Sequence, residues 1–117
     1  MNGVVAENQL TFEMLLNPSV LNPEDEARLS AQALQIYRLF KIAERMRQVL
    51  TTSDLAQIGR QYNARINEVR HALVKVGLMI DESRGKGGNN YYRVVPLEQS
   101  TFWSEKVVKK GLEYKWL

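Results

Sequence analysis

Cysteine is absent from this sequence of 117 residues, and histidine occurs once, as His71. Without thiols, the chain cannot form disulfide bonds or use a thiolate as a nucleophile or zinc ligand. A single histidine cannot complete a conventional zinc site, and no strained nucleophile turn accompanies it. We therefore expect a protein that is not an enzyme, has no catalytic residue and needs no metal or other cofactor.

Long apolar runs are also missing. No stretch approaches the ~18 residues of a membrane-spanning helix, and the first residues lack the basic and then apolar order of a secretion signal. The length of the chain suits one domain with added terminal elements. These features predict a cytoplasmic protein that has no contact with a membrane.

Charge is distributed unevenly along the chain. Residues 1–30 carry five acidic residues and one basic residue, which gives a net charge of −4. The remaining residues carry 15 basic and eight acidic side chains, which gives +7. Such an asymmetry favours a polyanionic partner for the body of the protein.

Signals for helices begin at residue 22. Asn22 can cap a helix, Pro23 suits its first position, and the acidic run Glu24–Glu26 suits its first turn. A single long helix is predicted from here to the region of Arg47. Its apolar residues recur every three or four positions and form a face for the core: Leu29, Ala33, Ile36, Phe40 and Ala43.

Two shorter helices are predicted next. Thr51 and Asp54 have the spacing of a capping box, which indicates a helix over residues 53–61. Its buried residues are expected to be Leu55, Ala56 and Ile58. Asn63 then caps a third helix over residues 64–76, which ends where Gly77 adopts a left-handed conformation. The core face of this third helix is expected to be Ile66, Val69, Leu73 and Val76.

A β-hairpin is predicted after the third helix. The β-prone runs 78–80 and 91–95 are separated by a polar loop rich in glycine and asparagine, and Pro96 ends the second run. Arg84 and Lys86 lie in this loop. Glycines allow the chain to reverse direction there, and they also let two cations approach a phosphate backbone closely.

The order of these elements carries a resemblance to a known family. Three segments together resemble the winged helix-turn-helix superfamily of bacterial and phage regulators: Leu50–Ala56, Ile66–Leu73 and Val76–Ile80. The resemblance covers residues 32–96. It departs from the family in the Gly59–Asn63 connection and at Arg70, where many relatives have an aliphatic residue. The resemblance implies an α+β, mostly helical fold, in which a three-helix core carries a β-hairpin wing.

We expect an N-terminal extension over residues 1–21, the winged domain over residues 22–96 and a C-terminal helix over residues 97–117. Ser100 can cap this helix. The apolar side of the helix either packs on the first helix of its own chain or forms a homodimer interface. We favour the homodimer, because aromatic anchors dominate association energetics. The expected interface residues are Trp103, Val107, Leu112 and Trp116.

The predicted function is sequence-specific binding of double-stranded DNA by a small transcriptional regulator associated with the nucleoid. Helix 64–76 would enter the major groove, where arginine can pair with guanine and asparagine with adenine. The wing, residues 83–90, would lie on the backbone or in the minor groove. The expected base-reading residues are Ala64, Arg65, Asn67, Glu68 and His71. The expected phosphate contacts are Thr51, Thr52, Ser53, Arg60, Lys75, Arg84 and Lys86.

Two other classes of function stay open. The first is a winged helix used for protein interaction or assembly in replication or DNA packaging. The second is the target-recognition domain of a nuclease. Glu113 and Lys115 have the spacing of one half of a nuclease metal site, but an isolated pair of this kind is frequent by chance. Selection from random DNA duplexes distinguishes sequence-specific DNA binding from the protein-interaction class, since only sequence-specific binding enriches a motif.

Overall fold

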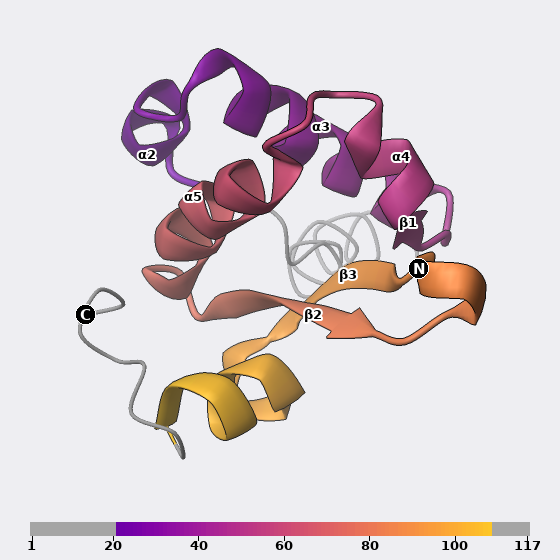
Figure 1. The fold of residues 1–117 in the computed structure, drawn as a ribbon. Coiled ribbons are helices and arrows are strands. Elements are labelled where there is room, and N and C mark those ends of the chain that lie inside the picture. The colour runs from indigo at the N-terminus through magenta and orange to yellow at the C-terminus, as the bar shows by residue number, and fades with distance from the viewer. Residues whose placement is uncertain (1–20, 109–117) are drawn as a thin grey trace, which may run out of the picture.

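The computed structural model describes residues 21–108 (Figure 1). Residues 1–20 of the expected N-terminal extension and the last nine residues of the expected C-terminal helix lie outside these described residues. The described helices are α2 (Pro23–Ala27), α3 (Ala31–Arg45), α4 (Thr52–Ala56) and α5 (Tyr62–Val74). The strands are β1 (Leu50–Thr51), β2 (Leu78–Ser83) and β3 (Tyr91–Pro96). Shorter elements are the 3₁₀ turns η1 (Lys86–Gly88) and η2 (Leu97–Gln99) and the π-helix η3 (Phe102–Val108).

The three strands form one antiparallel sheet in the order β1-β3-β2. β2 and β3 are the arms of the predicted hairpin, in which Ile80 pairs with Val94 and Ser83 with Tyr91. β1 is only two residues long and pairs Leu50 with Tyr92. The structure therefore confirms a small α+β fold that is mostly helical. None of the described helices combines the length and apolarity needed to cross a membrane.

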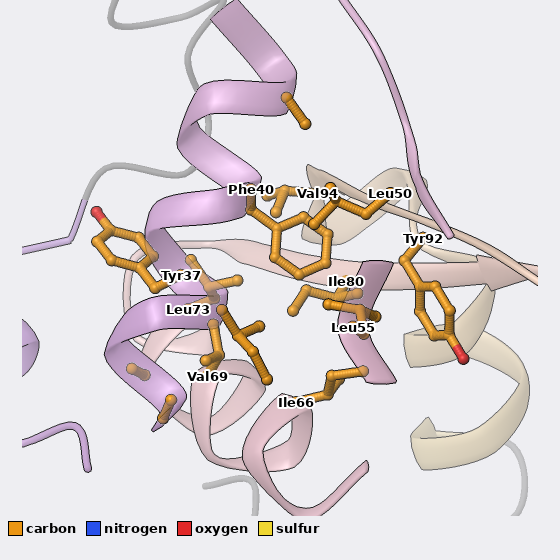
Figure 2. Close-up of a cluster of buried hydrophobic side chains, with 14 of the residues drawn as sticks. Tyr37, Phe40, Leu50, Leu55, Ile66, Val69, Leu73, Ile80, Tyr92 and Val94 are labelled. Carbon is orange, nitrogen blue, oxygen red and sulfur yellow. The ribbon is translucent and has the colours of Figure 1, made fainter. Parts of the chain in front are cut away.

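One hydrophobic core holds α3, α4, α5 and the inner face of the sheet together (Figure 2). The predicted core positions that are confirmed as buried are Ala33, Ile36, Phe40, Ala43, Leu55, Ile66, Val69 and Leu73. Burial of each large aliphatic or aromatic side chain contributes roughly 1.5–3 kcal/mol. The prediction for Ala56 was wrong, because α4 is one short turn that buries Leu55 and leaves Ala56 exposed.

The predicted long helix is interrupted after α2. Ser30 caps α3, because its Oγ accepts a hydrogen bond from the Ala33 N–H at 3.3 Å. Its own backbone N–H and hydroxyl donate to the two carboxylate oxygens of Glu68 at 2.6 and 2.9 Å. Glu68 lies on α5, so a contact between distant segments holds Ser30 in a non-helical conformation. The sequence pattern could not reveal that contact.

The boundaries of the next two helices also differ from the prediction. α4 ends at Ala56, and α5 begins at Tyr62 with Gln61, not Asn63, in the cap position. The capping box of Thr51 and Asp54 is confirmed, with each residue's side chain bonded to the other's backbone N–H. Gly77 has a φ of +77°, which confirms its predicted left-handed conformation after the third helix.

The C-terminal helix η3 packs on β2, on the face of the sheet opposite to α3 and α5 (Figure 1). Ser100 caps it as predicted, because its Oγ accepts from the Trp103 N–H at 2.9 Å. Val107 is only 1% exposed within its own chain. The assignment of Val107 to a dimer interface was therefore wrong, since this side chain is already used to attach the helix to the sheet.

Tyr37 and Tyr92 lie at opposite ends of the core, and each directs its hydroxyl group outward (Figure 2). The hydroxyl oxygen of Tyr37 accepts a hydrogen bond from the Leu21 N–H at 2.8 Å. Burial raises the pKa of the Tyr37 phenol above its ordinary value of 10.0. Tyr37 therefore contributes stability that is present below pH 10 and is lost as the pH rises through the folded-state pKa.

We expect Tyr37→Phe to lower the free energy of unfolding by about 1 kcal/mol at neutral pH, because the Leu21 N–H loses its acceptor. The loss of stability above pH 10 should become shallower, because the phenol no longer ionises in the unfolded chain. Urea unfolding at a series of pH values measures both effects. Tyr91→Phe, at an exposed position, is the control. An unchanged alkaline profile in Tyr37→Phe would contradict this account.

Candidate nucleic-acid interface

The outer face of α5 is exposed to solvent. Its inner face is fixed by Ile66, Val69 and Leu73, which are at most 1% exposed. Asn63, Ala64 and Asn67 are exposed. This face is therefore built of short, uncharged side chains, two of which are carboxamides that can both donate and accept hydrogen bonds. Ala64 and Asn67 were predicted as base-reading residues, whereas Asn63 was assigned only to a cap.

Arg65 and Glu68 are occupied within the chain. The Nη1 atom of Arg65 lies 3.0 Å from a carboxylate oxygen of Glu68 and 3.3 Å from the Oγ of Ser30. The two side chains are 28% and 31% exposed. Together with Ser30 they connect α5 to the start of α3. Their predicted role in base reading stays a prediction, and Arg65 would have to leave Glu68 to reach a base.

His71 and Lys75 lie beside α2. The Nζ atom of Lys75 is 3.6 Å from an Oδ atom of Asp25, and the lysine side chain is 58% exposed while that of Asp25 is 13% exposed. His71 is half-buried and lines a shallow hollow of about 150 Å³ together with Asp25, Glu68 and Lys75. The predicted roles of His71 in base reading and of Lys75 in phosphate contact remain predictions.

The hairpin tip presents two exposed cations. Arg84 and Lys86 are exposed, and their side chains make no hydrogen bond or ion pair with any other described residue. Gly87 and Gly88 have φ values of +59° and +79°, so the chain reverses through conformations that favour glycine. Arg60, in the turn before α5, is likewise exposed and makes no such contact with the described part of the chain.

The tip is fastened to the start of α4. The Oδ1 atom of Asn89 accepts hydrogen bonds from the N–H and the hydroxyl of Ser53 at 3.0 and 3.1 Å. The Asn90 N–H donates to the Oγ1 of Thr52 at 2.9 Å, and the Thr52 N–H donates to the Asn90 carbonyl oxygen at 3.0 Å. These bonds position the cations of the tip relative to the α4–α5 pair.

The same bonds change the interpretation of the α4 cap. Thr51, Thr52 and Ser53 were predicted to contact phosphates, partly through free N–H groups at the helix start. In the structure the N–H groups of Thr51, Thr52 and Ser53 donate to Asp54, Asn90 and Asn89. The backbone donors of this terminus therefore serve the fold. Phosphate contacts from the three hydroxyl groups remain predictions.

The carboxylate of Glu82 connects the tip to the sheet. Its Oε2 atom accepts from the Nδ2 of Asn90 at 2.7 Å and from the hydroxyl of Tyr92 at 3.3 Å. Burial raises the pKa of the Tyr92 phenol, so this hydroxyl stays protonated as a donor at neutral pH. The hairpin thus has its own polar network beneath the exposed cations.

Arg70 is buried, with 5% exposure, at the junction of three elements. Its Nε and Nη2 atoms donate to the carbonyl oxygen of Ile80 at 3.0 and 2.8 Å. Its Nη1 atom donates to the Oδ1 of Asn67 at 3.4 Å, and its Cζ lies 3.7 Å from the centre of the Phe102 ring. Burial lowers the pKa of Arg70 to about 10, and the nearby Glu82 and Asp81 carboxylates partly offset this effect.

This role of Arg70 was missed by the sequence reasoning. The available signal was the charged residue itself, which stands at a position where an aliphatic one was expected. A buried charge needs hydrogen-bonding partners, and Ile80 supplies one from outside the helix. Among the predicted interface residues of the C-terminus, Trp103 is half-buried, and Leu112 and Trp116 lie outside the described residues.

No family model and no curated protein matches this chain significantly, and no solved structure does. Across residues 21–108, no group of three or more histidine, cysteine, aspartate or glutamate side chains could hold a metal ion. The assignment of a function therefore depends on the geometry of the exposed surfaces.

We expect Asn90→Ala to loosen the hairpin tip. Its side chain accepts from the Gly85 N–H at 3.3 Å and donates to Glu82, and both partners lose that contact in the variant. Backbone amides in the tip should exchange with solvent about fivefold faster or more, which corresponds to ~1 kcal/mol. Hydrogen exchange followed by NMR measures this effect. Arg93→Ala, at an exposed position on β3, is the control, and equal exchange in both variants would show that Asn90 does not hold the tip.

Proposed function

We propose that this protein is a winged helix-turn-helix protein that binds double-stranded DNA in a sequence-specific manner. The order of elements supports this proposal: α3, β1, α4 and α5 are followed by the β2-β3 hairpin, and β3 is the central strand. In this interpretation α5 is the recognition helix and residues 83–90 are the wing. The protein would then be a small transcriptional regulator associated with the nucleoid.

The wing tip carries the exposed cations Arg84 and Lys86 and is bonded through Asn89 and Asn90 to the start of α4. α4 leads directly into α5, whose outer face is exposed. An exposed helix and a loop that carries two cations and is bonded to the start of α4 therefore belong to one unit, which suits a major groove beside a phosphate backbone.

The two surfaces would have different tasks. Ala64 and Asn67 are uncharged and exposed on α5, so they suit contacts with base edges, including a thymine methyl group for Ala64. Arg84 and Lys86 would neutralise phosphates and release counterions, which supplies affinity without sequence preference. Arg60 lies in the turn before α5 and would add a third phosphate contact.

Selection from random duplexes should return a DNA motif. We expect Asn67→Ala to relax the preference at one base pair by about 1–3 kcal/mol, because a base edge loses its partner. Lys86→Ala should weaken binding to all duplexes alike and reduce the slope of log K against log salt by about one. Fluorescence anisotropy at several salt concentrations measures both effects.

Arg38→Ala is the matched control, because Arg38 is an exposed cation on α3, outside both surfaces. It should leave the motif and the salt slope unchanged. If selection returns no motif, the interpretation as a protein-interaction or assembly module becomes the better one. If Arg38→Ala and Lys86→Ala have equal effects, the wing has no special role in binding.

We also propose that the regulator acts as a homodimer whose contact includes Trp103, Leu112 and Trp116. A dimer would place two recognition helices about 34–36 Å apart on a palindromic site. Light scattering should give twice the chain mass for the full-length protein at micromolar concentration and a smaller mass for Trp103→Ala. Val107→Ala is not a suitable test, because Val107 is buried within its own chain. A full-length monomer would contradict this part of the proposal.

A further inference from the structure

We propose that Arg70 orients the carboxamide of Asn67 so that α5 prefers guanine over adenine at one position, and that the docked helix η3 maintains this orientation. Arg70 would then be a positioning residue that does not itself touch DNA. The inference rests on the proposed function, because it specifies how one residue of the same surface reads a base.

Strand β2 holds the guanidinium of Arg70 through hydrogen bonds. Two of its nitrogen atoms donate to the Ile80 carbonyl oxygen, which belongs to β2, the strand at one side of the described sheet. This forked contact fixes the plane of the guanidinium as well as its position. The remaining nitrogen, Nη1, is thereby directed toward Asn67 on the exposed side of α5.

Helix η3 supports the guanidinium from the other side of the sheet. Phe102 is the first residue of η3, and its ring centre lies 3.7 Å from the Arg70 Cζ. Asp81 holds the start of the helix, because its carboxylate accepts from the Ser100 hydroxyl and from the N–H groups of Thr101 and Phe102. Loss of the ring would therefore leave one face of the guanidinium without its cation–π contact.

Chemistry determines which end of the Asn67 side chain faces Arg70. Arginine has only donors, so the atom of Asn67 that faces Nη1 must be the acceptor, Oδ1. The NH₂ group of Asn67 is then the end that presents donors to a ligand. Because Asn67 is exposed, these donors are available to a base edge.

This orientation favours one type of base. The major-groove edge of guanine offers two acceptors, N7 and O6, which match the two hydrogens of the NH₂ group. Adenine offers N7 and an NH₂ donor, and pairing with both would require Oδ1 to accept from the base and from Arg70 at the same time, at an angle set by the Arg70 contact. Asparagine without such a neighbour pairs with adenine, so Arg70 reverses the expected preference.

The DNA experiment compares full-length wild type, Asn67→Ala, Phe102→Leu and Phe102→Tyr by selection from random duplexes. Leucine retains an apolar side chain but has no π face, whereas tyrosine retains the ring. We expect wild type and Phe102→Tyr to prefer guanine over adenine at the Asn67-dependent base pair by about tenfold. We expect that preference to fall about fivefold in Phe102→Leu, with total affinity little changed.

Thermal unfolding of each variant establishes that it is folded. Phe102 is changed because loss of the Arg70 side chain would leave the buried Ile80 carbonyl without a partner and could unfold the chain. A preference for adenine in wild type would overturn the proposal. Equal preferences in wild type and Phe102→Leu would also overturn it, because a purely structural Phe102 has no effect on base choice.

A second measurement needs no DNA. The side-chain NH₂ signals of Asn67 are assigned in ¹⁵N-labelled protein by their loss in Asn67→Ala. These signals should shift in Phe102→Leu and stay in place in Phe102→Tyr. If no duplex is bound but the signals respond in this way, the proposed function fails while the positioning role of Arg70 stands. Signals that are unaffected in Phe102→Leu would overturn the positioning role whether or not DNA binds.

Discussion

The structure depends on one buried cation, the guanidinium of Arg70. It contacts α5 through Asn67, β2 through the Ile80 carbonyl and η3 through the Phe102 ring, so it joins both faces of the sheet. A charge at this depth is tolerated only because its nitrogen atoms find acceptors and its flat face finds an aromatic ring. The hydrophobic core holds α3, α4 and α5 on one face, and Arg70 connects that face to the C-terminal helix on the other.

A second set of polar contacts sets the position of the wing. Asn89 and Asn90 form hydrogen bonds with Ser53 and Thr52. The carboxylate of Glu82 accepts hydrogen bonds from the side chains of Asn90 and Tyr92. A glycine-rich loop is expected to be loosely held, but these amides attach it to a helix terminus that has N–H donors to offer. In the proposed interface, the wing would supply affinity and α5 would supply base preference, and the contacts between the wing and α4 fix these two surfaces relative to each other.

Local signals predicted most of the fold. The capping box of Thr51 and Asp54, the left-handed Gly77 and the apolar stripe of α5 are properties of neighbouring residues, and all three are confirmed. The break at Ser30 and the environment of Arg70 depend on residues far away in the chain, which periodicity does not report. The periodicity of the helix predicted that Asn67 is exposed. It did not reveal that Arg65 is paired with Glu68.

The position of β2 at the side of the described sheet has a consequence for solubility. A strand edge with open backbone groups is a template for pairing with other chains and for aggregation. At Ile80 the outward carbonyl is covered by two arginine donors, so an incoming strand would have to displace a buried cation. Arg70, which connects the two faces of the sheet, therefore also blocks strand pairing at the edge of β2 and so disfavours self-association there.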